Sequence, residues 1–196
     1  MTINEEKLIK IQEKLREKLI LIDDFKNAKN IAGVDVAYKN DKAFCGVVIM
    51  SKNKVILKKT KESRVKFPYI PSFFAFREAP AIIKTVKEVK KKIDILLVNG
   101  HGIAHPRGFG LASHVGLILD LPTIGVATSL LCGKIKENYI LLNRKRVGYK
   151  YKNIYISPGH RISLSSSIKI VQGCMANHRL PEPLHRAHLL SKNCKG

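Results

Sequence analysis

Two apolar runs constrain the fold of this chain most strongly. Residues 93–98 and 122–127 are each long enough for one strand and contain at most one charged or polar side chain. Such runs are typical of strands that are covered on both faces of a sheet. Between them, the segment 109–119 has the pattern of a helix. Buried strands that alternate with helices indicate an α/β domain.

The other segments add antiparallel strands to this arrangement. An amphipathic helix is expected first, followed by three short strands joined by tight turns, which form a meander. We therefore expect one domain over residues 1–196, with a mixed sheet flanked by helices. The expected bounds are 4–28 for the first helix, 31–38, 43–50 and 54–61 for the meander, 75–91 for the second helix, 138–142, 146–150 and 153–157 for later strands, 163–176 for the last helix, and 178–196 for an irregular tail.

Composition limits the class of protein. A chain of 196 residues with 45% hydrophobic residues can bury one core. Its apolar runs are too short to span a membrane, so no membrane partner is expected. The N-terminus is charged from Glu5 onward, which predicts a cytoplasmic protein without a signal peptide. The four cysteines form no CxxC pair, and this favours reduced thiols over disulfides or a zinc site.

The net charge of +21 is extreme for a chain of this size. The basic residues cluster over 52–92 and again over 134–152. A polyanionic partner is the favoured interpretation, because lysines and arginines that neutralise phosphates release condensed counterions. The alternative is a basic surface that serves solubility or thermal stability.

Three polar residues lie where predicted elements begin or end. Asp35 follows the apolar run 31–34, Glu78 begins the second helix, and Asn99 follows the run 95–98. Oxygen ligands at such positions could hold a divalent cation. For Asp35 the alternative is a salt bridge to a lysine. For Glu78 the alternative is a favourable interaction with the helix macrodipole, which would also keep the carboxylate ionised.

Three further segments are candidates for contacts with a ligand. The glycine- and histidine-rich segment 99–108 follows a buried strand, where α/β sheets bind ligands. The aromatic segment 67–74 could stack on bases, although packing of its own apolar residues onto the core is the better-supported interpretation from this segment alone. His160 lies between a predicted strand and a helix, where it could transfer protons or simply belong to a loop.

Taken together, these segments resemble the endonuclease V family of repair nucleases for deaminated purines. The resemblance implies a ribonuclease H-like fold, Mg²⁺ with Mn²⁺ as a substitute, a monomer, and DNA containing deaminated bases as the partner, with RNA as a further possibility. It rests on IAGVDVAY (31–38), PYIPSFFAFREAPAI (68–82), LLVNGHGIAHPRGFGLASHVGLILDLPTIGVATS (96–129), SPGHRISL (157–164) and HRLPEP (178–183).

The resemblance also assigns roles to residues. Asp35, Glu78 and the residue at position 99 would ligate the metal, and His160 would lie near the metal-bound water. The remaining assignments concern the substrate: Tyr69, Ile70 and Pro71 as a wedge that enters the duplex, Gly100, Gly102 and His105 as the pocket for the extruded base, and Thr128 beside the scissile phosphate.

Two positions depart from the family pattern. The family has aspartate where this chain has Asn99, and many members have lysine where it has Thr128. Both changes remove charge that would bind the metal or offset charge on the reacting phosphate. The resemblance implies nicking one nucleotide 3′ of the lesion, and the two departures lead us to expect reduced or absent turnover. The alternatives are a non-catalytic nucleic-acid-binding homologue and an inosine-specific ribonuclease.

Overall fold

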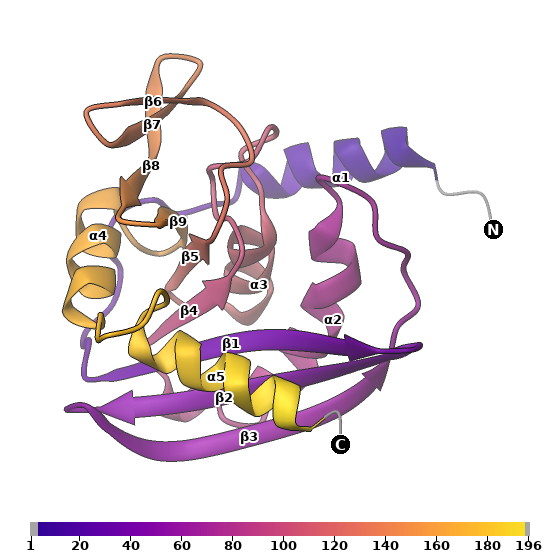
Figure 1. Cartoon of the computed structure of the whole chain (residues 1–196). Coiled ribbons are helices and arrows are strands. Elements are labelled where there is room, and N and C mark those ends of the chain that lie inside the picture. The colour runs from indigo at the N-terminus through magenta and orange to yellow at the C-terminus, as the bar shows by residue number, and fades with distance from the viewer. Residues whose placement is uncertain (1–3, 195–196) are drawn as a thin grey trace.

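A computed structural model describes residues 4–194, and its main feature is one nine-stranded mixed sheet with the order β3-β2-β1-β4-β5-β9-β8-β7-β6. Helices cover both faces of this sheet (Figure 1). The architecture is the α/β arrangement expected from the alternating buried runs. None of the described helices is long and apolar enough to cross a membrane.

One half of the sheet is the predicted meander. Strands β1 (Asn30–Lys39), β2 (Lys42–Ser51) and β3 (Lys54–Arg64) pair antiparallel in sequence order. Asn40 takes a positive φ of 56° in the turn between β1 and β2, a conformation that asparagine tolerates better than most residues. All three strands extend beyond the predicted bounds, and the edge strand β3 alternates between partly buried and exposed residues.

The other half begins with parallel strands. β4 (Ile95–Asn99) pairs parallel with β1 and with β5 (Thr123–Ala127), and β9 (Ile154–His160) then runs antiparallel to β5. Beyond β9, a second meander extends to the sheet edge through β8 (Lys145–Tyr151), β7 (Tyr139–Leu142) and β6 (Lys134–Lys136). The short strand β6 was not predicted.

Each face of the central strands packs against a different pair of helices. In β4, Leu96 and Val98 belong to the core beneath α2 (Phe74–Lys87) and α3 (Leu111–Leu119). Ile95 and Leu97 belong to the core that includes residues of α4 (Leu164–Gly173) and α5 (Glu182–Asn193). This alternation of side chains explains the unbroken hydrophobicity of the run. A 3₁₀ turn, η1 (Lys90–Lys92), precedes β4.

The first helix is shorter than predicted. α1 covers Glu5–Arg16, whereas the apolar periodicity suggested a helix to residue 28. The following segment instead bonds to the start of α4: the Arg161 amide donates to the Ile20 carbonyl at 2.6 Å, and the Asp23 carboxylate accepts from the Ser163 amide at 2.8 Å. These tertiary contacts replace the helical bonds that the local sequence favours.

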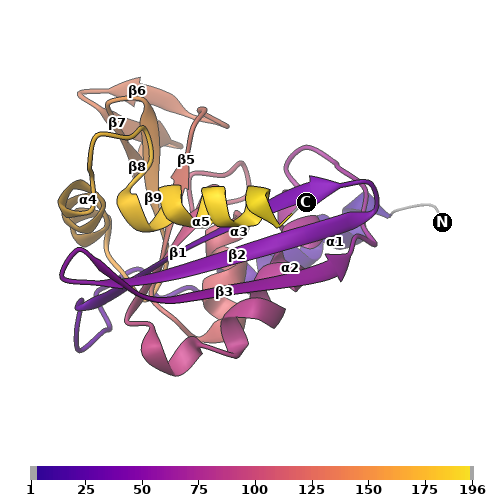
Figure 2. The same cartoon turned by 60° about the horizontal axis from the view of Figure 1, so that its bottom comes forward.

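The tail that was predicted to be irregular contains the helix α5. Pro181 and Pro183 suggested an irregular segment, but proline is tolerated in the first turn of a helix. α5 lies across β1 and β2 on the face opposite to α2 (Figure 2). A Cβ on Gly33 would lie 2.3 Å from the Pro183 carbonyl, so glycine at this position permits the close approach of the helix.

Candidate active site

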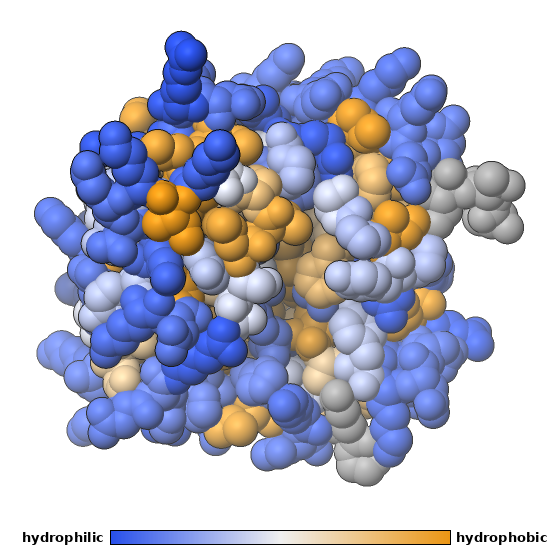
Figure 3. All heavy atoms as spheres, turned by 45° about the horizontal axis from the view of Figure 1, so that its top comes forward, coloured by the Kyte–Doolittle hydropathy of each residue, from blue (hydrophilic) through white to orange (hydrophobic). Residues whose placement is uncertain are grey.

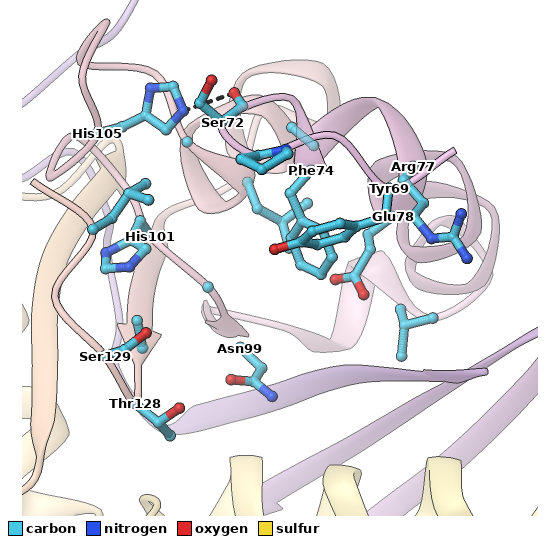
Figure 4. A pocket seen from close by; sticks show the side chains of 18 of the residues that line it. Tyr69, Ser72, Phe74, Arg77, Glu78, Asn99, His101, His105, Thr128 and Ser129 are labelled. Carbon is cyan, nitrogen blue, oxygen red and sulfur yellow. Dashed lines mark hydrogen bonds between the residues drawn. The ribbon is translucent and has the colours of Figure 1, made fainter. Parts of the chain in front are cut away.

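A cavity of about 580 Å³ lies where β1 and β4 meet the loops that follow β4 and β5 and the start of α2. It brings together Asp35, Glu78 and Asn99, which come from three separate segments of the chain. The Glu78 carboxylate and the Asn99 amide are directed toward the same space (Figure 4). The spatial convergence expected of these three residues is therefore present.

Asp35 lies on β1 with its side chain on the α5 face and is 6% exposed. Its Oδ2 atom is 2.7 Å from Nδ1 of His188 on α5, and the Ser191 hydroxyl donates to the same oxygen at 3.4 Å. Its Oδ1 atom accepts a hydrogen bond of 2.8 Å from Nδ2 of Asn99. The partner of Asp35 is thus a histidine, and not the lysine considered as an alternative.

Glu78 occupies the fifth position of α2, because the helix begins at Phe74 and not near residue 78. The interpretation of Glu78 as a first-turn carboxylate favoured by the macrodipole is therefore wrong. The residue is 4% exposed. Burial, and secondly the charge of Asp35, raise the pKa of Glu78 to about 8. Without a cation nearby, this carboxyl group is mostly protonated at neutral pH.

The donor atoms at the cavity fit a divalent cation. Two buried carboxyl groups, Asp35 and Glu78, lie close enough that the charge of one raises the pKa of the other. A cation between them would relieve this repulsion and offset the cost of burying charge. The Asn99 Oδ1 atom adds a neutral ligand atom, and His188 holds Asp35 in place from α5. Within residues 4–194, no group of three histidine, cysteine, aspartate or glutamate side chains is arranged to hold a metal, so the amide of Asn99 would be needed in any such set.

The aromatic segment projects Tyr69 from the rim of the cavity. Tyr69 is 66% exposed and packs edge-on against Phe74, with ring centroids 5.8 Å apart. Phe73, four residues later, is buried. The segment therefore combines an anchored part with a solvent-exposed aromatic ring, and packing onto the core does not account for Tyr69. Pro71 also lines the cavity, whereas Ile70 does not.

The aromatic segment 67–74, which we call the wedge segment after the role that the resemblance implies, is bonded to the loop that follows β4. Ser72 has a positive φ of 65°, and its carbonyl accepts from Arg107 Nη2 at 2.7 Å and from Gln12 Nε2 at 3.3 Å. Arg107 also donates to the Ser72 hydroxyl at 2.8 Å and to Gln12 Oε1 at 2.6 Å. Its guanidinium lies 4.5 Å from the centroid of the Phe73 ring. Arg107 thus connects α1, the wedge segment and the loop 99–108, which we call the pocket loop because it lines the cavity.

His105 is part of the same connection. Its Nε2 atom is 2.9 Å from the Ser72 carbonyl, and its Nδ1 atom accepts from the Arg107 amide at 3.3 Å (Figure 4). Burial lowers the pKa of His105 to about 4, so the ring is neutral at pH 7. A carbonyl can only accept, and this places the ring proton on Nε2.

In the loop after β4, Gly100 and Gly102 pack closely against neighbouring residues. A Cβ on Gly102 would lie 2.1 Å from the Pro158 carbonyl oxygen, which explains glycine there. Gly102 does not line the cavity, although Gly100 and His105 do. The amides of Gly100 and Gly102 donate to the Val126 carbonyl and the Ser157 hydroxyl. Both N–H groups are therefore already paired, so they are not free to donate to a base in the pocket that the resemblance implies.

His160 lies away from the cavity. It is the last residue of β9, where it pairs with Thr123 at the first residue of β5, whereas the cavity lies beyond the last residue of that strand. The residue is 2% exposed, and its Nδ1 atom accepts from the Ile20 amide at 3.3 Å. The expected position of His160 beside a metal-bound water is therefore wrong, since the antiparallel direction of β9 carries it to the opposite end of the sheet.

Other residues at the site were missed from the sequence. His188 contacts Asp35 from a helix that was not predicted, although the spacing of Leu184, Ala187 and Ser191, all buried, gave a helical signal. His101, Ser129 and Leu131 line the cavity together with Thr128. The Thr128 carbonyl accepts from Arg179 Nη2 at 2.6 Å, although Arg179 does not itself line the cavity.

The fold and the cavity define the class first: this is a ribonuclease H-like α/β nuclease that acts on phosphodiester bonds. The sequence profile of the endonuclease V family matches residues 13–189, and the chain belongs to this family. Endonuclease V of Dictyoglomus thermophilum is 40% identical, with 95% of this chain and 89% of the relative aligned. Endonuclease V of Rippkaea orientalis is also 40% identical, with coverage of 93% and 88%.

Solved structures agree with this assignment. The endonuclease V crystal structure from Streptomyces avermitilis superposes with a TM-score of 0.89 at 29% identity and covers 99% of this chain and 94% of that one. Endonuclease V of Ciona intestinalis, solved in complex with a 24mer DNA containing an inosine followed by a ribo-adenosine, gives a TM-score of 0.87 at 28% identity and 98% coverage of both chains.

Proposed function

We propose that this chain is a metal-dependent endonuclease that recognises a deaminated purine in nucleic acid. It nicks the phosphodiester bond one nucleotide 3′ of the lesion and leaves a 3′-hydroxyl and a 5′-phosphate. The observation that carries the proposal is the convergence of Asp35, Glu78 and Asn99 at one cavity beside the exposed Tyr69. The inosine-containing DNA bound by the Ciona intestinalis protein supports the choice of substrate.

Asp35, Glu78 and the amide oxygen of Asn99 would hold Mg²⁺, or Mn²⁺ as a substitute. When bound, the cation supplies Lewis-acid activation of water and stabilises the leaving oxygen. Asn99 orients Asp35 through their hydrogen bond, and His188 holds the second oxygen of the same carboxylate. Hard cations favour charged oxygen ligands, so the neutral amide at position 99 weakens binding relative to aspartate.

The substrate would be held by the wedge and the pocket loop. Tyr69 would fill the gap left by the extruded base, which costs least to remove from the stack when it is mispaired. The base would lie against the wall made by Gly100 and His105, whose neutral ring is already fixed by Ser72. Thr128 would face the phosphate without a charge of its own. Turnover should therefore be lower than in a protein with a lysine there.

A nicking assay tests the proposal. Inosine-containing and unmodified DNA and RNA are incubated with the wild type, Asn99→Asp and Glu78→Gln, in Mg²⁺, Mn²⁺ or EDTA. We expect cleavage only of inosine-containing substrates in the presence of metal, faster for Asn99→Asp and absent for Glu78→Gln. Cleavage by neither the wild type nor Asn99→Asp would overturn the nuclease proposal. Equal rates for these two proteins would overturn the argument about the missing charge.

A specific observation also favours a second function. The neutral Asn99 stabilises Asp35 without a metal, and this would suit a protein that binds the lesion and does not cut. Metal-independent binding of inosine-containing DNA by the wild type, with no cleavage under any of the conditions above, would favour this alternative. Cleavage of inosine-containing RNA but not DNA would instead identify a ribonuclease, since contacts to the 2′-hydroxyl distinguish the two polymers.

A further inference from the structure

The second meander, β6–β8, carries a dense positive charge that the cavity does not use. Residues 133–152 contain seven lysines and arginines against one glutamate, Glu137. The meander projects from the body of the molecule at the top of Figure 1, and β6 is the edge strand of the sheet. Both of its hairpin turns use two residues with positive φ, at 137–138 and 143–144.

One face of this meander is built from cations and tyrosines. Residues directly opposite one another in antiparallel strands project to the same face. Register pairs Lys136 with Tyr139, Tyr139 with Tyr149, Lys134 with Leu141, and Leu141 with Arg146. The side chains of these six residues therefore share a face, which we call the β6–β8 basic face. Ile140 and Gly148 project to the opposite face, where Gly148 approaches Ala104 of the pocket loop.

The cations of this face are available to a ligand. Lys134, Lys136 and Arg146 are exposed, and within residues 4–194 none of them forms an ion pair with a carboxylate. The Arg146 guanidinium lies 4.1 Å from the centroid of the Tyr139 ring, which itself packs edge-on against Tyr149 at 5.2 Å. Stacking on Tyr139 holds the guanidinium in place without using its N–H groups.

In the sequence, the β6–β8 basic face follows directly after residues that line the cavity. Thr128, Ser129 and Leu131 line the cavity, and β6 begins at Lys134, three residues after Leu131. Figure 3 shows a hollow in this side of the molecule with hydrophobic surface on both sides of it and hydrophilic side chains around it. A polymer held in the cavity would extend beyond it, and the charge on β6–β8 is the complement of a phosphate backbone.

We propose that the β6–β8 basic face binds the sugar–phosphate backbone of the substrate outside the cavity, independently of sequence, through Lys134, Lys136 and Arg146. This inference rests on the proposed function for the identity of the polymer. Tyr139 acts as a positioning residue for Arg146. The face contributes affinity for longer substrates, whereas recognition of the lesion stays in the cavity.

Salt-dependent binding in EDTA tests the proposal without cleavage. The probes are fluorescein-labelled, inosine-free DNA, as a single strand and as a hairpin duplex. The triple variant Lys134→Gln/Lys136→Gln/Arg146→Gln should reduce the slope of log affinity against log salt by about 2 on single strands and about 3 on duplex. The matched control Lys52→Gln/Lys54→Gln/Lys58→Gln removes the same charge from exposed residues of the other meander and should keep the wild-type slope.

A second pair of variants tests the role of the tyrosine without changing the charge. Tyr139→Leu removes the ring beneath Arg146 and should weaken binding roughly threefold, whereas Tyr139→Phe should bind as the wild type does. Circular dichroism and thermal melting verify that each variant is folded. An unchanged slope for the β6–β8 triple variant, or an equal change in both triple variants, would overturn the proposal. The proposed function fails on a different result, namely the absence of nicking by the wild type and Asn99→Asp.

Discussion

The Nδ2 atom of Asn99 donates a hydrogen bond of 2.8 Å to Oδ1 of Asp35. The two residues follow Val98 and Val34, which are register partners on the parallel strands β4 and β1. Their side chains therefore meet at equivalent positions of neighbouring strands. An aspartate at position 99 would place two carboxylates in contact, whereas the asparagine makes this pair stable without a cation.

Asn99→Asp should make stability depend on metal. In EDTA the variant loses a buried hydrogen bond and gains repulsion with Asp35, and we expect a cost of about 2 kcal/mol and a fall in Tm of about 6 °C. Saturating Mg²⁺ should raise the Tm of the variant more than that of the wild type, because the cation binds the variant more tightly. Thermal melting with and without Mg²⁺ measures both effects. Equal shifts in the two proteins would contradict the assignment of position 99 as a ligand.

Glu78 should make the metal-free protein less stable as the pH rises. Its folded pKa of about 8 lies above the ordinary value of 4.5, so the folded state holds this proton more tightly than the unfolded state does. The contribution is fully present below pH 4.5 and is lost as the pH rises toward 8. We expect a loss of a few kcal/mol, about 5 at most.

Urea denaturation at a series of pH values in EDTA measures this dependence, with Glu78→Gln as the comparison. The glutamine is close in shape and does not titrate, so the variant should lose most of the decline in stability above pH 5. A wild-type profile that matches the Glu78→Gln profile would show that the carboxyl group is not perturbed in this way.

Tyr69→Ala should impair duplex substrates more than single strands. The exposed ring lies at the rim of the cavity, where it can replace the stacking lost when a base leaves the duplex. We expect kcat/KM for inosine in duplex DNA to fall about tenfold more than for the same single strand. Tyr69→Phe retains the ring and serves as the control. An equal loss on both substrates would assign Tyr69 to general binding.

Arg107→Lys should loosen the wedge segment while keeping its charge. Lysine cannot reproduce the fork that contacts Gln12 and both oxygens of Ser72. We expect about 2 kcal/mol lower stability and faster amide hydrogen exchange over residues 67–73 than in the wild type. Arg144→Lys, in an exposed hairpin turn, is the matched control. Unchanged exchange in that segment would mean that other contacts hold the wedge.

Most of the strands and helices could be predicted from the sequence, because the strongest sequence signals are local. The apolar runs over 95–98 and 31–34 each report burial directly, and the structure contains both strands. In the segments whose structure was predicted wrongly, hydrogen bonds to distant residues determine the conformation. Ile20 and Asp23 bond to residues near Arg161 and not along a helix, and this could not be seen from the periodicity of that segment.

The same distinction applies to the site. The convergence of Asp35, Glu78 and Asn99 could be expected because all three lie in segments that resemble specific family motifs, although only Asn99 lies at the end of its element. His188 was missed because two prolines hid the start of α5, and its contact with Asp35 spans 153 residues. His160 was misplaced because its position depends on the direction of β9, and that is a property of the assembled sheet.

The contact between Asp35 and His188 has a consequence for synthesis of the protein. The ribosome synthesises Asp35 early and His188, which lies in α5, much later. The helix α5 can pack on the sheet only because Gly33 leaves room for Pro183. Before α5 has been synthesised, β1 and β2 can already pair, but the Asp35 carboxylate still lacks the His188 imidazole. A nascent chain that has emerged only as far as β9 would therefore hold Asp35 without its histidine partner, and under the proposed function the site would be completed only when α5 packs on the sheet.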